Sequence, residues 1–166
     1  MPEFLKDILS NHIILVPLMS WIVCQIIKFL ISSVSDRKLR WERLFGDGGM
    51  PSGHSSVVMS MTAICAWLYG CASPLFAISG VVAVIVMRDA MGVRRETGKQ
   101  TVSIKAIAEQ LNFLLKERDV NIRTEKLKEF VGHTPLQVFF GMIAGILVVI
   151  AYCWIRGIAY KSGIAF

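Results

Sequence analysis

Charged residues are scarce in this chain. Asp, Glu, Lys and Arg together make up 18% of its 166 residues, below the roughly one quarter that is typical of a soluble domain. Hydrophobic residues make up 54%, and the mean hydropathy is +0.57. This balance argues against a soluble domain and predicts a single-domain integral membrane protein. The net charge of +6 would suit nucleic acid, but the apolar content argues against that partner and favours anionic lipid.

Cysteine and histidine are also few, with four and three residues. The cysteines show no C-x-x-C spacing and three of them lie in apolar runs. This pattern predicts buried free thiols and supports neither a disulfide framework nor a metal site. The sequence has no internal repeat and no low-complexity segment, which disfavours a transporter built from repeats.

Long apolar runs account for most of the chain. Residues 11–34 are long enough to cross roughly 30 Å of hydrocarbon as one helix, and they lack the basic start and cleavage site of a signal peptide. Residues 55–91 are too long for one span, and Gly70–Pro74 interrupts them, which predicts two spans joined by a tight hairpin. Residues 135–160 form the last span. The predicted fold is therefore all-α: a polytopic membrane helix bundle with about four spans.

One polar segment, residues 88–132, separates the third span from the last. Within it, apolar residues recur at helical spacing from Ile104 to Leu115, which predicts an amphipathic helix. This helix either lies in the membrane interface or docks onto the spans. A second short helix is predicted at residues 124–131.

The basic residues are distributed unevenly between the two sides of the membrane. With four spans, residues 35–54 and 88–134 share one side, and they hold 14 of the 18 Lys and Arg residues. The positive-inside rule places this side in the cytoplasm of a multi-pass cell-membrane protein. The same topology brings His54 and His133 to one face, whereas His12 lies at the opposite face.

A basic loop turns into the second apolar run through the stretch Gly48-Gly49-Met50-Pro51-Ser52-Gly53-His54-Ser55-Ser56. A helix N-terminus presents unpaired N–H donors and partial positive charge, so it is a natural anion site. His54 can move a proton there near neutral pH. The alternative is a Gly/Pro turn with an incidental histidine. Lys28 and Gln25, near the end of the first span, either reach the interface or point into a polar site.

Two motifs resemble those of the type 2 phosphatidic acid phosphatase superfamily, which also includes vanadium haloperoxidases. Pro51-Ser52-Gly53-His54 matches the family's middle motif, P-S-G-H. The third motif, often R-x3-G-V-H-x-P-x-D-V-x-x-G, is present in two pieces, Arg88–Val93 and His133–Gly141. The 39 residues between them, 94–132, form an insertion within the motif. The chain is similar to the divergent branch that carries GGMPS-type and RDAxGVRR-type sequences.

Three departures separate this chain from the pattern of the active phosphatases. Met87 replaces the serine before the motif arginine. The first motif, K-x6-R-P, is absent as written, and the candidates for its charges are Lys28, Lys38 and Arg43. Gln137 replaces the aspartate four residues after the third-motif histidine. An amide can hold the imidazole tautomer but supplies no charge, and the comparable change in a serine-protease triad costs about 10⁴ in rate.

The resemblance implies a phosphohistidine mechanism without a metal or another cofactor. By motif match, His133 is the nucleophile, His54 is the general acid and Arg88 is a phosphate ligand. Gln137 stands where a residue would orient His133. A phosphoryl group needs several donors or positive charges, and the further candidates are Ser52, Gly53, Arg94, Arg95, Lys99, Arg43 and Lys28. The three basic residues that follow Arg88 are equally consistent with a solvated or headgroup-facing patch.

Three functions remain open at this point. The first is a membrane lipid phosphatase that hydrolyses a lipid phosphate or polyprenyl diphosphate. The second is a non-enzymatic protein that binds or moves lipid phosphates with the same pocket, and the third is a structural membrane subunit. The phosphatase requires His54 and His133 within roughly 10 Å of each other, because hydrogen bonds reach about 3 Å. It also predicts that the third span ends at Arg88, that Arg88 points into the pocket and that the amphipathic helix lies across or beside it.

Overall fold

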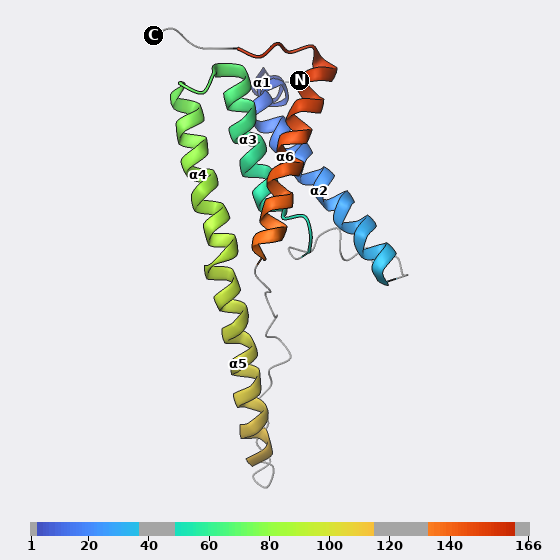
Figure 1. The fold of residues 1–166 in the computed structure, drawn as a ribbon, viewed down its shortest axis with the longest axis vertical. Coiled ribbons are helices and arrows are strands. Elements are labelled where there is room, and N and C mark those ends of the chain that lie inside the picture. Colours follow the sequence, from blue (N-terminus) through green and yellow to red (C-terminus); the bar gives the residue numbers. More distant parts are fainter. Residues whose placement is uncertain (1–2, 37–48, 115–132, 162–166) are drawn as a thin grey trace.

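The computed structural model describes residues 3–36, 49–114 and 133–161 (Figure 1). Regular structure in these ranges is entirely helical, which confirms the predicted all-α class. The helices are α1 (Glu3–Ser10), α2 (His12–Asp36), α3 (Gly53–Tyr69), α4 (Pro74–Met91), α5 (Val93–Leu114) and α6 (Pro135–Arg156). The second short helix, predicted at residues 124–131, lies outside the described residues.

Among the residues that the structure describes, three helical segments are long and apolar enough to cross a membrane: His12–Val34, Pro74–Leu114 and Pro135–Arg156. Helix α3 is shorter, with 17 residues and a length of about 25 Å. It packs against α2, α4 and α6 and so occupies the middle of the bundle (Figure 1). The four apolar helices predicted from the sequence therefore form one bundle around α3.

Close packing of α3 against α6 depends on two glycines one helical turn apart, Gly141 and Gly145. A Cβ at position 141 would lie 2.5 Å from the backbone oxygen of Ser52, and one at position 145 would lie 2.6 Å from that of Ser56. Only a residue without a side chain permits this approach, as in other close helix pairs of membrane proteins. The hydroxyl of Ser20 on α2 also hydrogen-bonds Ser56, so three helices converge at this level.

A tight hairpin joins α3 to α4, as predicted. Gly70 ends α3 with a φ of 80°, which favours glycine. Ser73 caps α4, because its hydroxyl accepts a hydrogen bond from the Phe76 N–H at 3.3 Å, and Pro74 occupies the first turn.

The insertion begins as a continuation of α4. The Gly92 N–H donates to the Arg88 carbonyl at 2.9 Å, and the Glu96 N–H donates to the Gly92 carbonyl at 3.0 Å. Helical hydrogen bonding therefore persists through Gly92, and α5 extends away from the bundle along the direction of α4 (Figure 1). Of the described helices, α5 contacts α4 alone. The predictions that the third helix ends at Arg88 and that the amphipathic helix lies across or beside the pocket are therefore wrong for the described residues.

Candidate functional site

His54 lies in the first turn of α3, and two sets of hydrogen bonds made by Ser52 hold this turn in place. Ser52 is the N-cap of this helix, and its hydroxyl accepts from the Ser55 N–H at 3.4 Å. The Ser52 N–H donates to the backbone carbonyl of Gln137 at 3.0 Å, which ties the start of α3 to the start of α6. The prediction that the stretch around Pro51–His54 opens the second apolar helix is confirmed.

His133 lies just before α6 and is buried, with 4% of its surface exposed. Its backbone N–H donates to the carbonyl of Ala90, in the last turn of α4, at 3.1 Å. Arg88 and His133 are 45 positions apart in the sequence, yet this bond joins the two pieces of the split motif. The chain therefore leaves at the end of α4 and returns to the same place, as the split motif predicts.

The two histidines of the motifs lie next to each other. The ring centroids of His54 and His133 are 6.0 Å apart, and the ring planes are inclined by 58°. This separation is well inside the limit of roughly 10 Å that a shared substrate sets. The third histidine, His12, lies elsewhere and hydrogen-bonds Tyr152 through Nδ1 at 2.8 Å.

Gln137 fixes the tautomer of His133. Its Oε1 accepts from the Thr134 N–H at 3.0 Å and so completes a capping box at the start of α6. The same oxygen lies 3.3 Å from Nδ1 of His133. Because an amide oxygen only accepts hydrogen bonds, Nδ1 must carry the proton. In the neutral ring the lone pair is therefore on Nε2.

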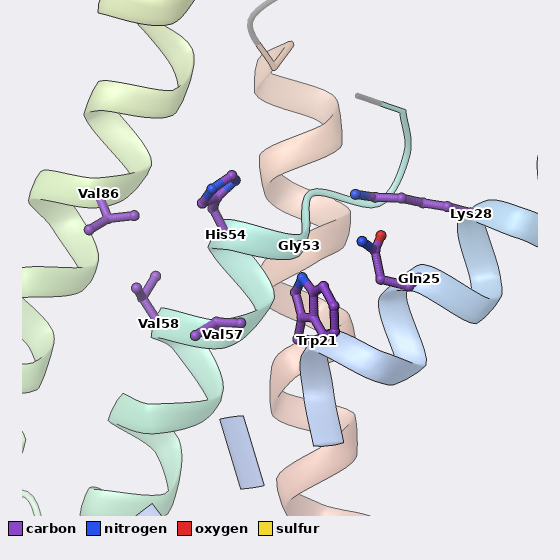
Figure 2. A pocket seen from close by; sticks show the side chains of 8 residues that line it. All are labelled: Trp21, Gln25, Lys28, Gly53, His54, Val57, Val58 and Val86. Carbon is purple, nitrogen blue, oxygen red and sulfur yellow. The ribbon is translucent and has the colours of Figure 1, made fainter. Parts of the chain in front are cut away.

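A cavity of about 130 Å³ lies beside His54, between α2, α3 and α4 (Figure 2). It is lined by Trp21, Gln25, Lys28, Gly53, His54, Val57, Val58 and Val86. Lys28 and Gln25 are each only 6% exposed. Of the two alternatives for Lys28, the structure therefore supports the polar site over a side chain that reaches the interface.

The electrostatics of this cavity favour an anion. Lys28 Nζ lies 3.6 Å from the point where a Cβ of Gly53 would be, so its ammonium is at the N-terminus of α3. The helix end contributes partial positive charge and N–H groups. An ammonium and a helix N-terminus gathered in one buried place form a natural position for a phosphate, carboxylate or sulfate group.

The other predicted phosphate ligands lie outside the cavity or outside the described side chains. Arg88 is exposed in the last turn of α4 and does not line the cavity, in contrast to the prediction that it points inward. Lys99 pairs with a glutamate one turn away on the exposed surface of α5, at 2.6 Å. The side chains of Arg94, Arg95 and Arg43 lie outside the described part of the chain. Within that part, no three His, Cys, Asp or Glu side chains are placed to share a metal ion.

Sequence reasoning missed two contributors to this site. Trp21 lines the cavity with Gln25 and Lys28, and its i, i+4, i+7 spacing to them was a signal that all three share one helix face. The second is the capping box formed by Thr134 and Gln137, for which the sequence T-P-L-Q is a typical signature. It explains how a glutamine holds the ring of His133.

The fold and the site define a class: an α-helical membrane protein with a histidine pair and an anion-suited cavity where α3 and α6 begin. No solved structure matches this chain. The sequence profile of the Divergent PAP2 family matches residues 9–148. The chain is also 40% identical over 154 residues to the uncharacterized membrane protein YuiD of Bacillus subtilis (strain 168), covering 88% of this chain and 98% of that protein. The chain therefore belongs to the Divergent PAP2 family, which confirms the predicted resemblance.

Proposed function

We propose that this protein is a membrane lipid phosphatase that works through a phosphohistidine. The observation that carries the proposal is the 6.0 Å separation of the His54 and His133 rings. Two imidazoles at this distance can both reach one phosphoryl group. The anion-suited cavity beside His54 supplies the positive charge that such a group needs.

In the proposed reaction His133 is the nucleophile and His54 is the general acid and base. Nε2 of His133 attacks phosphorus with its lone pair, while Nδ1–H remains bonded to Gln137. The ester P–O bond breaks, and the leaving oxygen takes a proton from His54. Water then attacks the phosphohistidine, gives its proton to His54 and releases inorganic phosphate, which restores both rings.

Charge on the phosphoryl oxygens is stabilised by Lys28 and by the first N–H groups of α3 in this proposal. Lys28 stands in for the missing lysine of the family's first motif, although it comes from α2 and has no R-P sequence after it. The side chain of Arg88 is exposed and does not line the cavity, so its role as a phosphate ligand stays a prediction. The substrate is drawn from membrane lipid, in the cell membrane and from its cytoplasmic leaflet.

A second candidate function has one observation in its favour. Gln137 occupies the place of the family's aspartate, and an amide supplies no charge to stabilise a cationic imidazole. A protein that binds a lipid phosphate in the same cavity, without hydrolysing it, needs no such charge. A measurement of phosphate release distinguishes the two functions, because only the phosphatase turns over its substrate.

The test measures phosphate release from a panel of lipid phosphates and polyprenyl diphosphates by purified protein in detergent. We expect release by the wild type, trapping of an acid-labile phosphoprotein, and loss of both in His133→Ala. His12→Ala is the matched control, because His12 bonds Tyr152 away from the pair and should leave activity intact. Binding of lipid phosphate without release by the wild type would instead establish the binding function.

A further inference from the structure

The first helix, α1, separates its polar and apolar residues completely. Its sequence is E-F-L-K-D-I-L-S. At 3.6 residues per turn, the four apolar side chains fall on one half of the helix and the four polar side chains on the other. The apolar half consists of Phe4, Leu5, Ile8 and Leu9. A helix with this pattern gains stability when its apolar half is removed from water.

The bundle does not cover this apolar half. Phe4 is 72% exposed, Leu9 is 54% exposed and Leu5 is 44% exposed, and no residue of α1 is buried. Among the described helices, α1 contacts α2 alone. The apolar half of α1 is therefore available to another surface.

Asn11 sets both the direction and the reach of α1. It is the single residue between α1 and α2, and its Oδ1 accepts from the Ile13 N–H at 2.9 Å, so that a new helix starts here. This break turns α1 away from the axis of α2, at the end of the bundle that also holds the α3–α4 hairpin (Figure 1). Because α2 is long and apolar enough to cross a membrane, α1 lies one residue from the end of a span.

Aromatic residues mark the depth at which α1 joins the bundle. His12, the first residue of α2, hydrogen-bonds Tyr152 of α6 through Nδ1 at 2.8 Å. Trp154, two positions further along α6, is 84% exposed, and Tyr160, just past that helix, is 50% exposed. Trp and Tyr are enriched where a span leaves the hydrocarbon, because their rings are apolar and carry one polar group. The start of α2, and with it α1, is therefore at the level of the membrane surface.

We infer that α1 is an interfacial anchor whose partner is the lipid bilayer at this surface. Its apolar half inserts at the boundary between the lipid headgroups and the acyl chains, and its polar half faces water. The contact is apolar rather than electrostatic, because α1 carries Glu3 and Asp7 against the single base Lys6. It therefore has no excess of positive charge to attract anionic headgroups.

The test measures how deep the two halves of α1 lie in a membrane. Phe4→Cys and the matched control Asp7→Cys are each made in a Cys71→Ser chain, because Cys71 is exposed whereas the other three cysteines are buried. Both positions on α1 are exposed, so neither substitution removes a core contact. Each variant is labelled with a nitroxide and reconstituted in phosphatidylcholine vesicles.

Depth is measured from collisions of the nitroxide with oxygen, which concentrates in hydrocarbon, and with a water-soluble nickel chelate present on both sides of the membrane. We expect the label at position 4 to lie in the bilayer and the label at position 7 to lie in water. The two depths should differ by about 10 Å, the diameter of a helix. Addition of phosphatidylglycerol, an anionic lipid, should leave this difference unchanged.

The other outcomes overturn the inference. Two labels at the same depth, whether in water or in lipid, would show that α1 does not lie in the interface with its apolar half inserted. A label at position 4 that neither reagent reaches would show that protein, such as a second copy of this chain, covers the apolar half. A depth difference that appears only with anionic lipid would make charge the cause of binding. Phosphate release plays no part in this test, so its result is independent of the proposed function.

Discussion

Replacing Gly141 by alanine should separate the two histidines without touching either of them. Gly141 is the point where α6 meets the start of α3: it lies against Ser52, which precedes His54 by two positions in the sequence. A Cβ at this position would lie 2.5 Å from the Ser52 backbone oxygen and 3.0 Å from Ser55 Cβ. Ser52 cannot rotate away, because the atom in the way belongs to its backbone.

The size of the effect follows from that distance. Ordinary contact begins at 3.4 Å, so the helices must part by about 0.9 Å, from 2.5 to 3.4 Å. Overpacking of this kind costs about 1–3 kcal/mol of stability. A displacement of about 1 Å at a catalytic group can cost on the order of 10²-fold in rate. We therefore expect Gly141→Ala to lose about 100-fold in phosphate release while it still folds.

Gly80→Ala provides the control for this experiment. Gly80 also lies in an apolar helix, α4, but of the described atoms a Cβ there would meet only Thr62 Cγ2, at 4.0 Å, and alanine favours the helix by up to about 1 kcal/mol. Phosphate release and thermal unfolding are measured for both variants in the same detergent. If Gly141→Ala retains the activity of Gly80→Ala, the α3–α6 contact does not set the histidine geometry and the reasoning fails.

Three further predictions test the charge, the topology and the chemistry. Lys28→Met should weaken the binding of inorganic phosphate by about 10- to 100-fold, while Lys161→Met, at the opposite end of the bundle, should not; equal affinities would remove Lys28 from the site. Cys71, exposed in the α3–α4 hairpin, and a Ser103→Cys variant on α5 should label from opposite sides of the membrane; labelling from one side would contradict the order of the spans. Activity should survive a chelator, and a loss restored by a divalent ion would count against the phosphohistidine.

The helices of the bundle could be predicted from the sequence, whereas the contacts between them could not. Span lengths follow from apolar runs and a turn of glycine and proline, which are local signals. The α3–α6 interface depends on the contacts of Gly141 with Ser52 and of Gly145 with Ser56. Such residue pairs cannot be predicted from hydropathy. The direction of α5 was missed because the third span was predicted to end at Arg88, whereas the helical hydrogen bonds continue through Gly92, a single glycine that costs a helix only about 1 kcal/mol.

The part of the site that comes from the two motifs could be predicted from the sequence. His54 and His133 were paired by the split motif, and the bond from His133 to Ala90 shows how the pieces meet. Lys28 could not be assigned from the sequence, because a lysine near the end of a span suits either the interface or a buried site. Its place is decided by the approach of α2 to Gly53, a tertiary contact.

Gln137 gives the sharpest test of whether this site catalyses or only binds. Its oxygen already holds His133 Nδ1–H at 3.3 Å and the Thr134 N–H at 3.0 Å, so Gln137→Glu keeps the geometry and adds the missing negative charge. A charge there stabilises the imidazole when it becomes cationic, and in a serine-protease triad its removal costs about 10⁴ in rate. We expect Gln137→Glu to raise the turnover rate at least about tenfold without changing the affinity for substrate. Gln137→Leu, which removes both hydrogen bonds, should lower it. If the glutamate variant releases phosphate no faster than the wild type, while both fold and bind alike, the argument that a negative charge at position 137 stabilises the cationic imidazole is wrong; if the leucine variant is as fast as the wild type, the orienting role assigned to Gln137 is wrong.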